Sequence, residues 1–513
     1  METAIHKPES AAQVAKVGFV SLKTKDGRQS LPPVKGKTVI LLILLTILAL
    51  LIHGYHVGVE DQEVYLAAIK KNLDPSTYPF NGTFFEEQMK AALFVPAVAA
   101  TARALHSLEW ALLLWHVLSL FGILLACWKL AAVCFELECG RWAALLLLTV
   151  LLTMPIAGTA LYPVDQYLNP RGPATCGILL ALAACLEKRW RRTAGWLLFA
   201  ALMHPLMALF GISLVLFVIR PVNSVPFGIP GFFAFLPIGL LQPPSEAWNE
   251  AVRARTYCFP LMWAWYEWLG LIAPLALVWW FAHIAKKNRM SVLHHLATRV
   301  TAFALFQLAV ALLILAFPGL RQLAAFQPMR WLHIFYFLFL LMGGGLAGQF
   351  LMRNRSWRWL ILFVPLAIGM FYAQRSLFEH SNHIEWPGAS LRNPWAKAFL
   401  WAKASTPKSA VFAIDPNYMA LPAEEGYGFR ALAERSLLAE NQKDPGEVMV
   451  FPALATEWQR QVHAQRDIEH FSREQFQELK TRYDVSWAVL PATAQVKQDC
   501  PYRNEVVQIC RVE

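Results

Sequence analysis

The chain has 513 residues, of which 57% are hydrophobic and only 16% are charged, and its formal net charge is +11. Soluble domains carry roughly a quarter of charged residues, so an ordinary soluble protein is excluded. A nucleic-acid-binding protein is also excluded, because the lysines and arginines form short clusters between apolar runs instead of one basic stripe.

The chain begins with a polar, basic segment followed by a first apolar run. Residues 1–37 show no cleavable signal peptide, and their lysines predict a tail that is retained in the cytoplasm. The apolar run 38–54 then crosses the membrane outward, which places the loop 55–106 outside. Within that loop the weakly apolar stretch 91–104 is expected to lie in the membrane interface.

Further apolar segments alternate with basic clusters such as KRWRR at 188–192 and KKNR at 286–289. Residues 194–219 form either one span or two short helices broken at His204-Pro205. The total is nine or eleven spans, and either odd count places the C-terminal region outside. The transmembrane domain therefore covers 38–373, with outer loops at 55–106, 162–171, 242–257 and 318–330. The expected spans are 38–54, 108–132, 142–160, 173–187, 263–284, 298–317, 331–351 and 359–373, together with either 194–219 as one span or its two halves followed by 226–241.

The C-terminal region, 374–513, has a different composition and holds more than half of all Asp and Glu residues. Apolar runs at 410–414, 485–490 and 506–512 predict buried strands, and 453–480 is mostly helical in pattern. Strands alternating with helices indicate a mostly parallel, Rossmann-like α/β sheet. Cys500 and Cys510 lie ten residues apart in this region, and spacing alone leaves open whether they form a disulfide.

An acidic cluster follows the first span directly. Glu60, Asp61 and Glu63 are three carboxylates within four positions, and ionised acids close to hydrocarbon are costly. Asp61 is the leading catalytic candidate, with Glu60 beside it, because such a carboxylate can act as a general base or hold a divalent cation. The alternative is that these acids only cap the helix that begins here.

The second outer loop supplies Asp165 and Arg171, which are candidates for a partner acid and an anion clamp. The alternative is an ordinary salt bridge in a proline-rich turn.

Arginines on the outer side are disfavoured by topology, so each needs a reason. Guanidinium groups that face an acidic site commonly bind phosphate, and Arg330 at the head of a span is placed to reach a lipid phosphate. Arg321 is a second candidate for this role. The alternative for any single arginine is snorkelling to phospholipid headgroups. His204 either lines a donor groove or only satisfies a carbonyl freed by Pro205.

Several short motifs carry a family resemblance: EDQEVY at 60–65 followed by LDPSTYP at 73–79, QPMR at 327–330, and WAKASTPKSAVF at 401–412. Together with the predicted architecture they resemble the GT-C superfamily of integral-membrane glycosyltransferases, which use polyprenyl-phosphate-linked sugars. The resemblance implies that a carboxylate of the first outer loop, here Asp61 or Glu60, deprotonates or positions the acceptor. It also implies a divalent cation (Mg²⁺ or Mn²⁺) as a candidate cofactor, with Asp61 as its candidate ligand. The tail has no WWD-type motif of oligosaccharyltransferases.

We therefore expect a polytopic α-helical membrane protein, GT-C-like, with a C-terminal extracytoplasmic α/β domain. Its expected activity is sugar transfer from a polyprenyl-phosphate donor to an acceptor on the periplasmic face of a bacterial inner membrane, with membrane lipid as its other partner. A transporter or flippase of a lipid-linked saccharide, and a non-catalytic scaffold, are the alternatives. Paired broken helices would favour the transporter, whereas separate surfaces for Asp61 and Arg330 would favour the scaffold.

Overall fold

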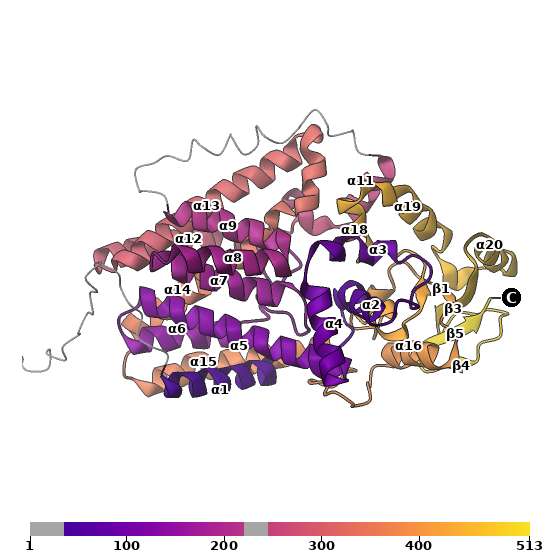
Figure 1. Ribbon diagram of the computed structural model, residues 1–513, viewed down its shortest axis with the longest axis horizontal. Helices are drawn as coiled ribbons and strands as arrows, with labels where there is room; N and C mark the ends of the chain where they lie inside the picture. The colour runs from indigo at the N-terminus through magenta and orange to yellow at the C-terminus, as the bar shows by residue number, and fades with distance from the viewer. Residues whose placement is uncertain (1–34, 220–244, 513) are drawn as a thin grey trace, which may run out of the picture.

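The computed structural model describes residues 35–219 and 245–512, and Figure 1 shows a helical bundle at one end and a small α/β domain at the other. The expected span 226–241 and most of the predicted basic tail 1–37 lie outside the described residues. Six of the described helices are long and apolar enough to cross a membrane, which makes this a multi-pass membrane protein. The bundle contains α1 (Gly36–His53), α5 (Leu108–Cys134), α6 (Glu138–Val150), α7 (Arg171–Leu186), α8 (Trp190–Met203), α9 (Pro205–Ile219), α12 (Trp265–Lys287), α13 (Ser291–Ala316), α14 (Trp331–Leu346), η7 (Ala347–Met352) and α15 (Ser356–Leu377).

Most expected spans coincide with helices of the bundle, and two differences are informative. The segment 194–219 forms two helices that break between His204 and Pro205, because proline at the first helical position disfavours helical backbone in the residue before it. The expected span 142–160 is wrong in its second half, since α6 ends at Val150. Pro155 and Gly158 follow in irregular backbone, and Gly158 has a positive φ of 63° and lies so close to Trp263 that a Cβ atom would clash.

Short helices from the outer loops form a layer between the bundle and the α/β domain (Figure 1). Phe84, Trp248 and Ala324 come from three different loops, yet they pack in one apolar cluster with Met449 and Trp458 of the C-terminal region. The outer loops and the C-terminal domain therefore share a core. The elements of this layer are α2 (Gln62–Leu73), α3 (Thr83–Glu86), η1 (Gln88–Ala91), α4 (Phe94–Leu105), α11 (Glu246–Ala254), η3 (Thr256–Cys258), η4 (Pro260–Met262), η5 (Pro318–Phe326) and η6 (Pro328–Arg330).

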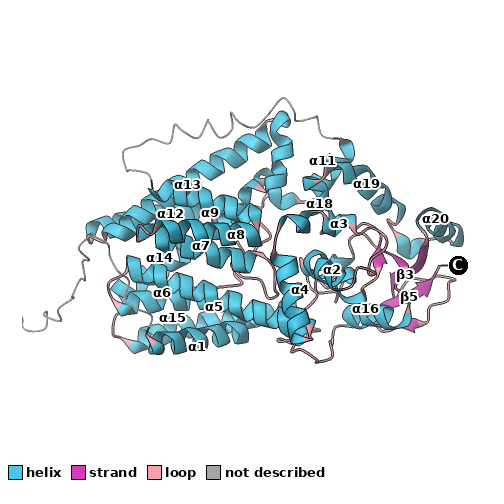
Figure 2. Cartoon of the chain, in the orientation of Figure 1, coloured by secondary structure: helices cyan, strands magenta, loops and turns pink. Residues whose placement is uncertain are grey.

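The C-terminal domain is built on a five-stranded sheet in the order β2-β1-β3-β5-β4, whose strands are magenta in Figure 2. Its elements are α16 (Pro394–Ser405), β1 (Val411–Ile414), η8 (Tyr418–Ala420), α17 (Phe429–Ala433), β2 (Ser436–Leu437), α18 (Asp444–Val450), η9 (Pro452–Leu454), α19 (Ala455–Ala464), η10 (Ile468–His470), α20 (Arg473–Tyr483), β3 (Val485–Pro491), β4 (Tyr502–Arg503) and β5 (Val507–Arg511). Alternate residues of β1 face opposite sides: Phe412 packs toward α16 and α17, and Val411 packs toward α20. The sheet is therefore covered by helices on both faces.

The expectation of a mostly parallel sheet holds for only half of it. β1 pairs in parallel with β2 and β3, but β5 runs antiparallel to both β3 and β4. Only a short loop separates β4 from β5, too short for the crossover that a parallel pair needs.

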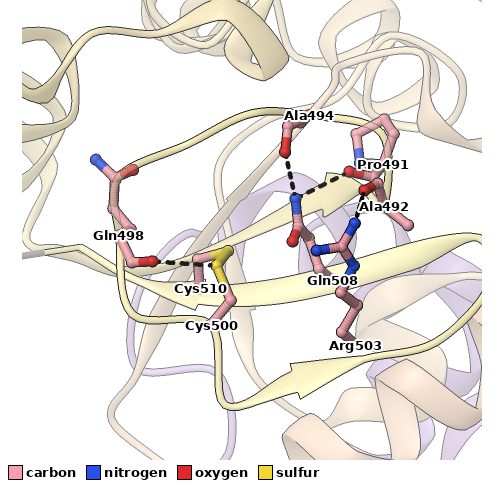
Figure 3. Close-up of a disulfide and its surroundings, with 8 residues drawn as sticks. All are labelled: Pro491, Ala492, Ala494, Gln498, Cys500, Arg503, Gln508 and Cys510. Atoms are coloured by element: carbon pink, nitrogen blue, oxygen red, sulfur yellow. Dashed lines mark hydrogen bonds between the residues drawn. A yellow bond between two sulfur atoms is a disulfide. The ribbon is translucent and has the colours of Figure 1, made fainter.

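Cys500 and Cys510 are joined by a disulfide, which settles the question left open by their spacing. Figure 3 shows this bond beside β5, where Gln508 donates hydrogen bonds to the carbonyls of Pro491 (3.2 Å) and Ala494 (2.8 Å). The disulfide and these hydrogen bonds fix the last part of the chain to the edge of the sheet.

The acidic loop of residues 55–61 is attached directly to the C-terminal domain. The amide of Glu60 donates to the carbonyl of Gly426 (2.6 Å), and the amide of Gly428 donates to the carbonyl of Gly58 (2.7 Å). Val59 and Tyr427 form a β-bridge between these two bonds. The loop that holds the acidic cluster is therefore part of the domain interface.

Candidate functional site

A cavity of about 510 Å³ lies between the membrane bundle and the C-terminal domain. Its wall is formed by the acidic loop, the irregular segment 155–167, the α11–η3 region, the start of α14 and the turn 442–447. Each of these segments lies outside the long membrane helices or at their ends. The ionisable and polar side chains on the wall include Glu60, Asp61, Asp165, Arg255, Tyr257, Gln327, Arg330, Gln442 and Lys443.

Asp61 lies at the start of α2, and its carboxylate has two cationic partners. Arg171 donates from Nη1 to Oδ2 at 2.6 Å, and the Nζ of Lys443 lies 3.3 Å from Oδ1. The Asp61 side chain makes no capping hydrogen bond to α2, which contradicts the interpretation that it only caps the helix. Its carboxylate is one-quarter exposed, and that exposed part faces the cavity.

The charges around Asp61 decide its basicity. Burial alone would raise the pKa of Asp61, but the positive charges of Lys443, Arg171 and Arg330 hold it well below its usual range. A carboxylate with such a low pKa is ionised at every physiological pH and is a weak base. The shift therefore favours a role in orienting or charge-stabilising a ligand over the role of a strong general base.

Arg171 and Asp165 do meet, but not in the way that an anion clamp requires. Arg171 is buried, and its Nη2 donates to Oδ2 of Asp165 at 2.9 Å while Nη1 is bound to Asp61. Asn169 donates to the same oxygen of Asp165. Arg171 thus binds two carboxylates and does not line the cavity. This geometry does not fit the expected phosphate-binding role, and it places Arg171 where it supports Asp61.

Arg330 is the guanidinium that remains available to a ligand. Within residues 35–219 and 245–512 its side chain has no hydrogen-bond or ion-pair partner, although its charge acts on Asp61. Gln327 begins the turn that presents it, with a φ of 45° in the left-handed region, and Pro328 starts η6. The side chain of Gln327 is also buried, and its Oε1 has no partner. Unsatisfied polar groups on one cavity wall are the pattern expected at a ligand site.

Arg255 also lines the cavity, and the sequence marked it only as one of several arginines on the outer side. Its Nη2 donates to the carbonyls of Gln442 (3.2 Å) and Lys443 (3.4 Å), and its Nη1 donates to the hydroxyl of Tyr257. Arg255 thereby joins an outer loop of the membrane domain to the turn that carries Lys443.

The other two candidates from the sequence lie elsewhere. Arg321 is part of η5 and is not among the residues that line the cavity. His204 is buried at the break between α8 and α9, within electrostatic reach of Arg330 and Arg171, and also does not line the cavity. Among the described residues its Nε2 has no hydrogen-bond partner, so this atom does not satisfy a carbonyl freed by Pro205.

The residues of the site do not form a divalent-cation site. In the described part of the chain there is no group of three or more His, Cys, Asp or Glu side chains placed to hold a metal ion. Both oxygens of Asp61 and one oxygen each of Glu60 and Asp165 are already bound to cations: Lys443 contacts Glu60 and Asp61, and Arg171 contacts Asp61 and Asp165. Asp61 therefore does not fit the expected role of a Mg²⁺ or Mn²⁺ ligand.

Lys443 is the functional residue that sequence analysis missed. Its ammonium binds an acid 383 positions earlier in the chain, and nothing local in the segment NQKDPG at 441–446 indicates that partner. The one available signal was the unpaired acidic excess of the first outer loop, which required a cation from elsewhere.

Comparison with known proteins gives distant structural likenesses. No protein-family model and no curated protein matches the chain. Three solved structures of the Archaeoglobus fulgidus oligosaccharyltransferase are similar in fold. The one in complex with Zn and sulfate has a TM-score of 0.42 and 13% identity, over 88% of this chain and 68% of that chain.

The archaeal oligosaccharyltransferase AglB with an inhibitory peptide and a dolichol-phosphate gives a TM-score of 0.41 and 12% identity, over 90% of this chain and 70% of that chain. The structure tethered through a disulfide to an acceptor peptide containing the NVT sequon gives 0.43 and 11%, over the same 90% and 70%. Likenesses this distant assign no residue and no activity, so the function proposed below rests on the geometry of the cavity.

Proposed function

We propose that the protein is an integral-membrane glycosyltransferase of the GT-C type, which transfers a sugar from a polyprenyl-phosphate donor to an acceptor outside the cytoplasm. The observation that carries the proposal is that an ionised carboxylate, Asp61, and a guanidinium without a partner among the described residues, Arg330, line one cavity next to the ends of membrane helices. In this proposal a lipid-linked donor enters the cavity from the bilayer and the acceptor enters from water. The proposed location is a bacterial inner membrane, with the C-terminal domain on the periplasmic side.

The proposed reaction forms a bond between the acceptor heteroatom and the anomeric carbon of the sugar, and it breaks the bond from that carbon to the phosphate oxygen. Negative charge develops on the departing phosphate, and Arg330 is placed to stabilise it. Asp61 accepts a hydrogen bond from the acceptor and orients its lone pair toward the sugar. Because the pKa of Asp61 is low, complete proton transfer to it becomes favourable only when the new bond is largely formed and the acceptor has become acidic.

The remaining candidates have supporting roles in this proposal. Asp165 and Arg171 hold Asp61 in place from behind. His204 and Arg321 are proposed to contact the lipid part of the donor, because His204 lies between two apolar helices and Arg321 lies in an outer loop. The sugar is expected to pack against tyrosines of the cavity wall, which include Tyr162, Tyr257 and Tyr266.

The two alternatives are less well supported by the geometry. A transporter needs interrupted helices in corresponding halves of the bundle, whereas in the described residues the break at His204-Pro205 has no counterpart. A scaffold was expected if Asp61 and Arg330 faced separate surfaces, but they line the same cavity.

The test is transfer from a panel of radiolabelled polyprenyl-phosphate sugars by the purified full-length protein. We expect Asp61→Asn to abolish transfer, and Arg330→Met to lower kcat by about 10²- to 10³-fold, as does removal of one charge-stabilising donor in other enzymes. Arg253→Met is the matched control, because Arg253 is an exposed arginine of α11 outside the cavity wall, and we expect it to keep wild-type activity. Full activity of a folded Asp61→Asn variant would disprove the proposal, and sugar-lipid flux without transfer would favour the transporter.

A further inference from the structure

The turn that carries Lys443 is fixed in place before any ligand binds. Both carboxylate oxygens of Glu440 accept backbone hydrogen bonds: Oε2 from Gln442, and Oε1 from Lys443 and Asp444, each at 2.6 Å. Arg255 binds the carbonyls of Gln442 and Lys443 from the membrane side. The backbone of this turn is therefore held from two directions, and the lysine side chain has a defined origin.

The ammonium group of Lys443 lies between two carboxylates of the acidic loop. Nζ contacts Oε2 of Glu60 and lies 3.3 Å from Oδ1 of Asp61, while its side chain is only 12% exposed. Burial would lower the pKa of Lys443, but the negative charges of Glu60 and Asp61 raise it well above its usual range. The ammonium is thus a permanent charge within the cavity wall.

Glu60 is positioned for this contact by an unusual backbone conformation. It has a φ of 52°, in the left-handed region that a residue with a side chain rarely adopts, and its amide is bound to Gly426. This conformation turns its carboxylate toward Lys443 of the C-terminal domain. Adjacent acids of one loop, converging on one point, are otherwise a common arrangement for a divalent cation.

We infer that Lys443 is a built-in cation, which occupies the place between Glu60 and Asp61 that a divalent metal ion would need, so that the acidic pair works without a metal. The catalytic part of this inference rests on the proposed function, whereas the exclusion of a metal ion from the pair does not. Lys443 is a positioning residue here: it holds Asp61 toward the acceptor, and it comes from a different domain. The site is therefore complete only when the C-terminal domain is docked.

The experiment is a titration of the purified full-length protein with Mn²⁺, followed by electron paramagnetic resonance of the free ion. We expect wild-type protein to show no Mn²⁺ site that depends on Glu60. Lys443→Gln removes the ammonium and frees two carboxylates, so we expect it to bind Mn²⁺ at least about 10-fold more tightly than wild type. Adding Glu60→Gln to this variant should remove the gain.

Lys408→Gln is the matched control, because Lys408 also joins the C-terminal domain to an acid of the first outer loop, Asp74, but on the exposed surface. We expect this control to bind Mn²⁺ as wild type does. A folded Lys443→Gln variant without a gain in Mn²⁺ affinity would overturn the inference.

If Lys443→Gln fails to fold, the single variant Glu60→Gln in the wild-type background decides instead. The inference requires that Glu60→Gln leaves Mn²⁺ binding unchanged, and a loss of binding would show that wild-type protein holds a metal ion at the pair. In the transfer assay, wild-type activity should be unchanged after chelation with EDTA. If the proposed function is wrong, no donor will give transfer, but the Mn²⁺ titration can still be interpreted.

Discussion

Asp61 and Glu63 are two positions apart in the sequence, yet the protein treats their charges in opposite ways. Asp61 faces the cavity, and nearby cations hold its pKa well below the usual range. Glu63 is completely buried against the C-terminal domain, and burial raises its pKa to about 8. One carboxylate is therefore always charged and accessible, whereas the other is mostly neutral and enclosed at neutral pH.

Each carboxylate belongs to a larger group of charges. We call Glu60, Asp61, Asp165, Arg171 and Lys443 the cavity cluster, since four of the five side chains line the cavity and Arg171 lies behind them.

The sealed cluster consists of Glu63, Arg430, Glu440 and Asp444. In it Arg430 binds Asp444 with two bonds of 2.7 and 2.8 Å, and the side chains of Glu63, Arg430 and Asp444 are at most 1% exposed.

The comparison distinguishes residues that hold the two domains together from residues that can contact a ligand. The sealed cluster does not line the cavity. Its Arg430–Asp444 ion pair lies within the C-terminal domain, and Glu63 links that domain to α2 by accepting from the amide of Ala431 at 3.0 Å. The cavity cluster lies next to Arg330, whose guanidinium has no partner in the part of the chain that the structure describes, so it can exchange contacts with a ligand. Loss of a charge should thus mainly affect stability in the first cluster and mainly affect activity in the second.

The largest effect on stability is expected for Arg430→Met. This change leaves the buried carboxylate of Asp444 without its bidentate partner, and breaking a buried pair in this way costs about 3–5 kcal/mol. Thermal unfolding of the purified protein, followed by near-ultraviolet circular dichroism, measures the loss. Arg392→Met, an exposed arginine of the same domain, is the control and should change the unfolding temperature little. Equal effects of the two substitutions would remove the distinction between the clusters.

Much of the fold was predictable from the sequence, because its dominant signal is local. Apolar runs predicted the positions of α1, α5, α12, α13 and α14, and the continuous apolar run at 410–414 predicted a buried strand. The prediction was wrong where a local signal was ambiguous, since Leu151 and Leu152 continue the apolar pattern of α6 after the helix has ended. The direction of β5 was also wrong, because strand pairing depends on contacts distant in sequence.

The candidate site was predictable only in part, for the same reason. Glu60, Asp61 and Arg330 could be singled out from the sequence, because charge beside a membrane span is a local anomaly, and all three line the cavity. Their roles stay predictions. The role of Arg171 depends on where Asp61 and Asp165 meet in space, and Lys443 comes from another domain. Neither contact has a signal in one sequence.

A smaller effect is expected from pH acting on the sealed cluster. The folded-state pKa of Glu63 is raised from 4.5 to about 8, so the folded protein binds a proton there that the unfolded chain has lost. Its contribution to stability is complete below the unfolded pKa and is lost as pH rises toward 8. Burial also raises the pKa of Glu440, to about 7, and its contribution has the same sign.

Between pH 5 and pH 8 we therefore expect the free energy of unfolding to fall by about 3 kcal/mol through Glu63, and Glu440 adds to this fall. Glu63→Gln mimics the protonated acid and keeps an oxygen that can accept from the amide of Ala431. This variant should make the free energy of unfolding less dependent on pH. Asp61→Asn should leave that dependence unchanged between pH 5 and pH 8, because Asp61 stays ionised. The measurement is the unfolding temperature at a series of pH values, and an equal slope for wild type and Glu63→Gln would contradict the assignment.

The smallest effect is expected at the edge of the same interface, where one carboxylate has two lysine partners. Glu434 lies 2.7 Å from Lys70 of α2 and 2.7 Å from Lys403 of α16, but the side chain of Lys70 is 13% exposed and that of Lys403 is 45% exposed. Lys70 also donates to the carbonyl of Ala431 at 2.6 Å. Because solvent screens the outer pair, Lys403→Met should change the free energy of unfolding by about 0.5 kcal/mol or less. Lys70→Met should cost more, because it removes both a shielded ion pair and a bond to the docked domain. Since both variants remove one positive charge from the same carboxylate, the difference between their effects measures the combined contribution of enclosure and of the hydrogen bond from Lys70 to Ala431.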